Sequence, residues 1–137
     1  MDELPDWPPG TVAILVTGGE RPHAIPVSAV VRAGPRRVLI GLAQARDSLA
    51  RLRRSPQVTV AICARDLAVS LDGAAEVLDE ELVDGVAAVA IEIEAIHDHD
   101  RPTFALHAGV AWEWTDEVAA RRDAEVQAAL RRLAGGP

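Results

Sequence analysis

The sequence predicts a mainly β domain of the α+β class, built as a closed or partly closed antiparallel barrel with flanking helices. Short β-forming runs recur between turn signals, only two stretches show helical spacing, and there is no internal repeat. Many short strands with few helices favour closure, because a closed sheet leaves no exposed edges. Strands are expected over residues 11–17, 23–32, 37–42, 57–64, 67–78, 86–97 and 103–114, and helices over 45–54 and 115–136.

The turns between the first strands follow from glycine and proline. Gly18 and Gly19 give the turn chemistry of a hairpin, and Ala33 to Arg36 form the next turn. Pro26 interrupts the second run, which predicts an edge or a bulge because proline cannot donate to a ladder.

The first helix carries Leu49 and Leu52 at helical spacing and stops at Ser55-Pro56. In the long run that follows, Gly73 indicates a bulge or a close backbone approach, and acidic residues 79–81 indicate a loop. The last helix takes Thr115 as its N-cap and ends at Gly135-Gly136, with an apolar stripe that includes Val118, Arg122, Val126, Ala129, Leu130 and Leu133.

Composition limits the chemistry that the chain can perform. Its 137 residues fit one domain, 1–137, and carry a formal charge of −7. All 14 basic residues are Arg, which excludes a lysine Schiff base and a phosphate-binding lysine. An acidic chain with 3% aromatic residues is a poor nucleic-acid binder.

Cysteine and hydropathy give further limits. The lone Cys63 excludes an internal disulfide, and its apolar run predicts a small buried side chain rather than a reactive thiol. No apolar stretch is long enough to cross a bilayer, and the N-terminus does not resemble a signal peptide. We therefore expect a cytoplasmic protein without a membrane partner.

Positive charge is concentrated in one segment. Residues 46–54 contain four Arg and one Asp, at a point where a strand gives way to a helix start. Free N–H groups and the helix dipole bind phosphate at such a junction. The alternative is a solvated helix whose Arg residues offset the acidic remainder.

Other candidate sites have weaker patterns. His97 and His99 lie two residues apart before a turn, but no third ligand has diagnostic spacing, so a solvated loop is favoured over a metal site. Trp112 and Trp114 would share one face of a strand, either packing in a core or interface or stacking on a planar ligand. No nucleophile elbow, dinucleotide fingerprint or phosphate-binding loop is present.

From residue 11 to residue 77 the chain resembles the pyridoxamine 5′-phosphate oxidase-like flavin-binding split barrels. The resemblance is carried by residues 12–17, 22–27 and 38–41, by the helix with Leu52-Arg53-Arg54-Ser55-Pro56-Gln57-Val58, and by the strand Val69 to Val77 with its Gly73. It implies a split β-barrel of six to seven antiparallel strands and a homodimer with flavin mononucleotide (FMN) between the protomers. Relatives also use deazaflavin or haem.

The same resemblance assigns a cofactor site. Arg46 and Ser48 are expected on the phosphate, with Arg51 on the next turn. The residues expected beside the ring are Val27, Ser28, Ala29, Gly41, Leu42 and Ala43, and either Trp112 or Trp114 would be the aromatic residue from the partner subunit. The family often has lysine near the phosphate, whereas this chain has none and carries Asp47 there.

The resemblance implies a flavin-dependent oxidoreductase acting on a small substrate. The alternative is a non-catalytic binding or sensor barrel that holds a deazaflavin, a haem or no ligand. No side chain is identified as a catalytic acid or base, and no metal ligand is assigned.

Overall fold

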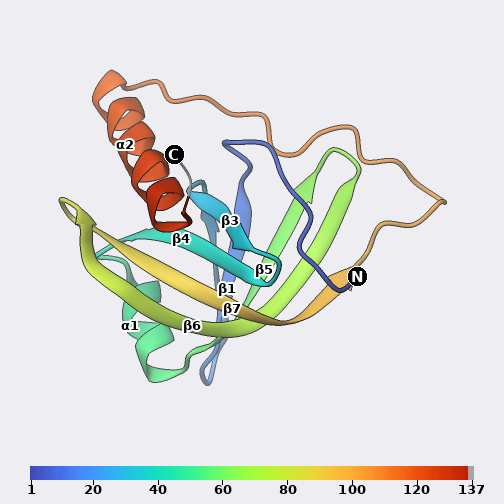
Figure 1. Ribbon diagram of the computed structural model, residues 1–137, viewed down its shortest axis with the longest axis horizontal. Helices are drawn as coiled ribbons and strands as arrows, with labels where there is room; N and C mark the ends of the chain where they lie inside the picture. The colour runs from blue at the N-terminus through green and yellow to red at the C-terminus, as the bar shows by residue number, and fades with distance from the viewer. Residues whose placement is uncertain (136–137) are drawn as a thin grey trace.

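The computed structural model describes residues 1–135, which form seven antiparallel strands and two helices (Figure 1). The strands are β1 (Ala13–Thr17), β2 (His23–Val27), β3 (Val30–Gly34), β4 (Arg37–Ala43), β5 (Gln57–Ala64), β6 (Leu67–Val83) and β7 (Val86–Asp98). The helices are α1 (Asp47–Arg54) and α2 (Glu117–Leu133). The predicted mainly β, α+β barrel with flanking helices is confirmed.

One continuous sheet has the order β2-β1-β5-β6-β7-β4-β3. Its two edge strands, β2 and β3, are separated in the chain by Ser28 and Ala29 alone. The sheet must therefore curl until its edges approach each other, and the barrel stays split at this point because no ladder joins β2 to β3 within residues 1–135. The edge position of β2 confirms the interpretation of Pro26.

Alternating side chains build the barrel interior. Val58, Val60, Ile62 and Ala64 of β5 point inward, with Ala13 and Leu15 of β1 beside them. This alternation corrects one prediction: Cys63 is exposed, because a period of two places it on the outer face between two inward residues.

Gly73 confirms the predicted close approach. The β6–β7 register shifts between Asp72 and Gly73, and a Cβ atom on Gly73 would lie 2.3 Å from the carbonyl oxygen of Glu92. Only glycine allows the two strands to pack this closely, so the long β6–β7 hairpin can bend around the barrel (Figure 1).

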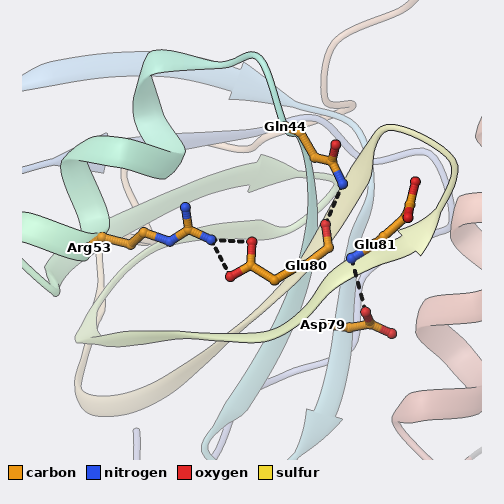
Figure 2. A network of polar contacts seen from close by, with 5 residues as sticks. All are labelled: Gln44, Arg53, Asp79, Glu80 and Glu81. Carbon is orange, nitrogen blue, oxygen red and sulfur yellow. Dashed lines mark hydrogen bonds and ion pairs between the residues drawn. The ribbon is translucent and has the colours of Figure 1, made fainter.

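The acidic residues 79–81 belong to β6 and not to the predicted loop. Polar contacts hold them on the outside of the barrel: Arg53 of α1 binds both carboxylate oxygens of Glu80, and Gln44 Nε2 donates to the carbonyl oxygen of Glu80 at 2.6 Å (Figure 2). The ion pair between Arg53 and Glu80 offsets part of the negative charge, so this acidic run can form part of a strand rather than a loop.

Two other predicted strands are wrong. The run 23–32 is two strands, because residues 23–27 pair with β1 whereas residues 30–34 pair with β4. Residues 103–114 form no strand. They belong to an irregular, mostly exposed segment, 99–116, that leads from β7 back across the molecule to α2 (Figure 1).

Helix α2 covers the outer face of β3, β4 and the β6–β7 hairpin. Val126 and Leu130 pack there against Ala29, Leu39 and Val86. Its N-cap is Asp116, which accepts a hydrogen bond from Val118 N at 2.9 Å, rather than the predicted Thr115. In the predicted stripe, Val126, Ala129 and Leu130 are buried, whereas Val118 and Leu133 are exposed. The predicted end at Gly136 lies outside the described residues.

Candidate functional site

A pocket of about 250 Å³ opens where the barrel is split. It brings together eight residues that the resemblance assigned to a cofactor site: Val27, Ser28, Ala29, Gly41, Leu42, Ala43, Arg46 and Trp114. We call it the split pocket. The end of β2, the end of β4 and the residues after them supply most of its lining, so the fold itself positions these distant segments.

Helix α2 supplies a wall that sequence reasoning did not assign. Its residues Ala119, Arg122, Asp123 and Val126 line the split pocket, as does Val86 at the start of β7. The apolar stripe predicted that Arg122 and Val126 share a helix face, but no sequence signal showed which strands that face covers.

The main-chain groups at the split are partly satisfied within the chain. Gly41 N donates to the carbonyl oxygen of Ala29 at 3.1 Å, and Gln127 Nε2 of α2 donates to the carbonyl oxygen of Ser28 at 2.8 Å. These bonds fix the segment 27–29 between β4 and α2. The site is therefore rigid on the side that the ring of a flavin was expected to occupy.

Arg46 lies at the N-terminus of α1 and lines the split pocket. It is the N-cap residue, and within residues 1–135 its side chain makes no hydrogen bond that caps the first turn of the helix. The uncapped N–H groups and the guanidinium together favour an anion. This end of the pocket can therefore bind a phosphate.

Ser48, the second residue of α1, is 1% exposed, and its Oγ atom has no hydrogen-bond partner in the described part of the chain. Ser48 is not among the residues that line the split pocket. A buried hydroxyl without a partner is costly, so this atom marks a place where a ligand oxygen or a water is needed.

Asp47 and Arg51 neutralise each other on the same helix. Arg51 Nε donates to Asp47 Oδ2 at 2.8 Å, and this hydrogen bond holds the pKa of the Asp47 carboxyl below its ordinary value. Arg51 also donates to the carbonyl oxygen of Arg21 at 3.1 Å and lines a different pocket, beside the β1–β2 turn. The structure therefore separates Arg51 from Arg46, and its expected role on a phosphate stays a prediction.

The two indoles of the irregular segment lie edge to face, with their centroids 5.2 Å apart and their planes at 80°. Trp112 Nε1 donates to the carbonyl oxygen of Gly10 at 2.9 Å, whereas Trp114 lines the split pocket. Of the two candidate aromatic residues, the structure brings Trp114 to the other predicted site residues of the same chain.

His97 and His99 lie on the outer face of the barrel, away from the split pocket. His97 contacts Asp72, and His99 Nε2 lies 2.7 Å from Ser70 Oγ. In the part of the chain that the structure describes, no group of three or more His, Cys, Asp or Glu side chains is placed to hold a metal ion. None of the described residues lining the split pocket is a His, Cys or Met, the common axial ligands of haem iron.

Comparison with known proteins gives matches to solved structures alone. No protein-family model and no curated protein matches the sequence. A Listeria innocua protein assigned as a pyridoxamine 5′-phosphate oxidase superposes with a TM-score of 0.55 at 16% identity, over 65% of this chain and 88% of its own. This chain has the split-barrel fold of pyridoxamine 5′-phosphate oxidase-like proteins.

Flavin reductases share the same split-barrel fold. The flavin reductase component of a bacterial two-component tryptophan halogenase matches with a TM-score of 0.56 at 14% identity, over 67% of this chain and 81% of its own. A Streptomyces globisporus NADH:FAD oxidoreductase matches with a TM-score of 0.54 at 13% identity, over 65% and 75%. No helix within residues 1–135 is long and apolar enough to span a membrane.

Proposed function

We propose that this protein binds a flavin in the split pocket and acts as a flavin-dependent oxidoreductase on a small substrate. The observation that carries the proposal is the convergence of β2, β4, α1 and α2 on one pocket that has an apolar wall and a cationic end. The flavin reductases that share this fold support the same cofactor class.

The lining of the split pocket suits a flavin with a phosphate. Val27, Leu42 and Val126 offer apolar contact to a planar ring, and Trp114 offers an aromatic surface. Arg46 and the uncapped start of α1 suit the phosphate of FMN. When bound, a flavin supplies hydride transfer, and the chain would orient its ring and exclude water from it.

We also propose that a homodimer completes the site. A volume of about 250 Å³ lies below the range of roughly 300–1,000 Å³ that is usual for small-molecule sites. Trp114, which is 44% exposed, lies on the irregular segment that connects β7 to α2. A second chain would enlarge the pocket and cover this indole. Sedimentation velocity with and without FMN tests the proposal, and a protein that stays monomeric in both contradicts it.

Titration with FMN and riboflavin tests the cofactor. Arg46→Glu is expected to weaken FMN binding by about 10- to 100-fold, the equivalent of one charge-assisted hydrogen bond, and to leave riboflavin binding nearly unchanged. Arg54→Glu is the matched control, because it makes the same charge change on the same helix but lies outside the split pocket. Absence of flavin binding to the unaltered protein would contradict the proposal.

Reduction of the bound flavin tests the enzymatic part separately. We expect the flavin absorbance to bleach under anaerobic conditions when NADH or NADPH is added and to return with air. A flavin that binds but is reduced by neither nucleotide would favour a non-catalytic binding or sensor protein.

A further inference from the structure

A second pocket, of about 500 Å³, lies between the N-terminal segment, β3 and the last turns of α2. We call it the Trp7 pocket. Its volume falls within the range of small-molecule sites, and within residues 1–135 it shares no lining residue with the split pocket. It therefore needs an explanation beyond the proposed flavin site.

Trp7 is held in a fixed position at this pocket. Its Nε1 atom donates to the carbonyl oxygen of Val30 at 3.0 Å, and its partly buried ring packs against the barrel core. Because the indole N–H is already satisfied, the ring offers an apolar aromatic surface to a ligand. Val31, which is partly buried on the outer face of β3, adds an aliphatic surface to the pocket, whereas the side chain of its neighbour Val30 belongs to the barrel core. A planar ring can bind such a surface with little loss of side-chain entropy.

The same pocket carries two guanidinium groups, from Arg32 and Arg131, and one carboxylate, from Asp6. Arg32 Nε donates to the carbonyl oxygen of Leu4 at 3.0 Å, which fixes the side chain and leaves its terminal nitrogens without a partner within residues 1–135. The pocket is thus locally cationic in a chain with a formal charge of −7. Guanidinium groups bind carboxylates and phosphates through paired hydrogen bonds.

Arg131 also has a structural role, because a cation in the last turn of a helix stabilises the helix dipole. Arg132, its neighbour in the same turn, is exposed like Arg131 and fills this role equally well, but it does not line the pocket. Comparing variants of the two arginines therefore distinguishes an effect on the helix from an effect on the pocket.

We propose that the Trp7 pocket binds a planar aromatic anion, with the ring against Trp7 and Val31 and the carboxylate or phosphate on Arg32 and Arg131. The site does not rest on the proposed flavin function. It is adjacent to the split pocket, however, because Gln127 lines the Trp7 pocket while its Nε2 atom bonds to Ser28 of the split pocket.

Calorimetric titration of the whole protein tests this proposal with three probes. Adenosine 5′-monophosphate carries a phosphate, 2-naphthoate carries a carboxylate, and adenosine is the uncharged counterpart of the first. We expect at least one of the two anions to bind, and adenosine to bind at least about tenfold more weakly than the monophosphate if the phosphate arm is the one that binds. Failure of both anions to bind would overturn the proposal.

Variants then locate the binding site. Arg131→Glu is expected to weaken the anion by at least about tenfold, whereas Arg132→Glu leaves its affinity unchanged. Trp7→Leu should weaken binding as well. Because Trp7 also packs against the core, the Arg131 variant carries the test if the Trp7 variant does not fold. Equal effects of the two arginine variants would overturn the proposal.

FMN, which is itself a planar aromatic anion, distinguishes this site from the split pocket. FMN binding that falls with Arg46→Glu and not with Arg131→Glu places the flavin in the split pocket. In that case the titrations with adenosine 5′-monophosphate, 2-naphthoate and adenosine alone test whether the Trp7 pocket binds an aromatic anion. FMN binding that falls with Arg131→Glu and not with Arg46→Glu supports the Trp7 pocket and overturns the split pocket as the flavin site.

Discussion

Gly41 of β4 lies so close to Val126 of α2 that a Cβ atom at Gly41 would be 2.8 Å from Val126 Cγ1. Both residues line the split pocket. The absence of a side chain at residue 41 therefore sets how near α2 approaches the sheet, and with it the width of the pocket.

Gly41→Ala is expected to lower the free energy of unfolding by about 1–3 kcal/mol, because the added methyl overpacks the contact with α2. Val126→Ala removes the facing methyl groups. The double variant should therefore lose less stability than the sum of the two single variants. Denaturant unfolding of the unaltered protein, the two single variants and the double variant measures this coupling. Strictly additive losses of stability would show that the packing at residue 41 does not depend on the side chain at residue 126.

The variant Ser48→Ala tests whether the buried Ser48 hydroxyl contacts a ligand or is simply an unsatisfied polar group in the core. If the Ser48 Oγ atom contacts the FMN phosphate, the variant should bind FMN about tenfold more weakly and riboflavin unchanged, the loss of one hydrogen bond. Without ligand, the variant should be no less stable than the unaltered protein, because it removes a buried polar atom that has no partner among the described residues. Unchanged FMN affinity would remove Ser48 from the predicted site.

The sequence predicts strands well where alternation is paired with a clear turn. Residues 57–64 were expected as a strand and form β5 with the same bounds, and Gly73 was expected at a bulge or a close approach and is found there. Ser28 carries no turn signal, so the break between β2 and β3 was missed. Strand-like composition at 103–114 was misleading, because a strand also needs a neighbouring edge to pair with.

The candidate site shows a similar limit. Local sequence identified the cationic junction at Arg46, the family resemblance added the segments 27–29 and 41–43, and the sheet order brings all three together. It could not identify the α2 wall, because amphipathicity shows which helix face is buried but not what it packs against. It also grouped Arg51 with Arg46, although the ion pair with Asp47 turns Arg51 toward the β1–β2 turn.

Asp72 gives a prediction for the dependence of stability on pH. Thr59 Oγ1 donates to its Oδ1 atom at 2.8 Å and His97 Nε2 lies 2.9 Å from Oδ2, and these hydrogen bonds lower the pKa of the Asp72 carboxyl. The folded pKa lies below the unfolded value of about 3.9, so the contribution is present above that pH and is lost as the pH falls through the folded pKa.

Asp72→Asn should therefore lower the free energy of unfolding at neutral pH and have a smaller effect in acid. With the side chain 47% exposed, solvent screening limits the loss to under about 1 kcal/mol. Thr59→Val should move the NMR titration midpoint of the Asp72 carboxyl upward, because it removes the larger cause of the shift. A loss for Asp72→Asn that is the same at all pH values would contradict this account.

The irregular segment 99–116 should be the site where chymotrypsin first cleaves the native protein. The chain has no Tyr, its one Phe lies here at residue 104, and two of its three Trp residues, 112 and 114, lie here as well. All three side chains are at least 38% exposed, and the segment forms no ladder that would protect its backbone. The remaining indole, Trp7, precedes a proline, which blocks cleavage after it. Mass spectrometry should therefore find early cuts after residues 104, 112 and 114.

The fragments should stay together after cleavage, because α2 packs on β3 and β4 through Val126 and Leu130 rather than through the segment that is cut. Gel filtration in buffer should give one peak, and denaturant should separate the barrel from α2. Early cleavage after the buried leucines of β4 or β6 would contradict the protection of the barrel, and loss of α2 under native conditions would contradict the packing of this helix. Val126→Ala should promote dissociation of the cut protein, because it removes apolar contact from the same interface.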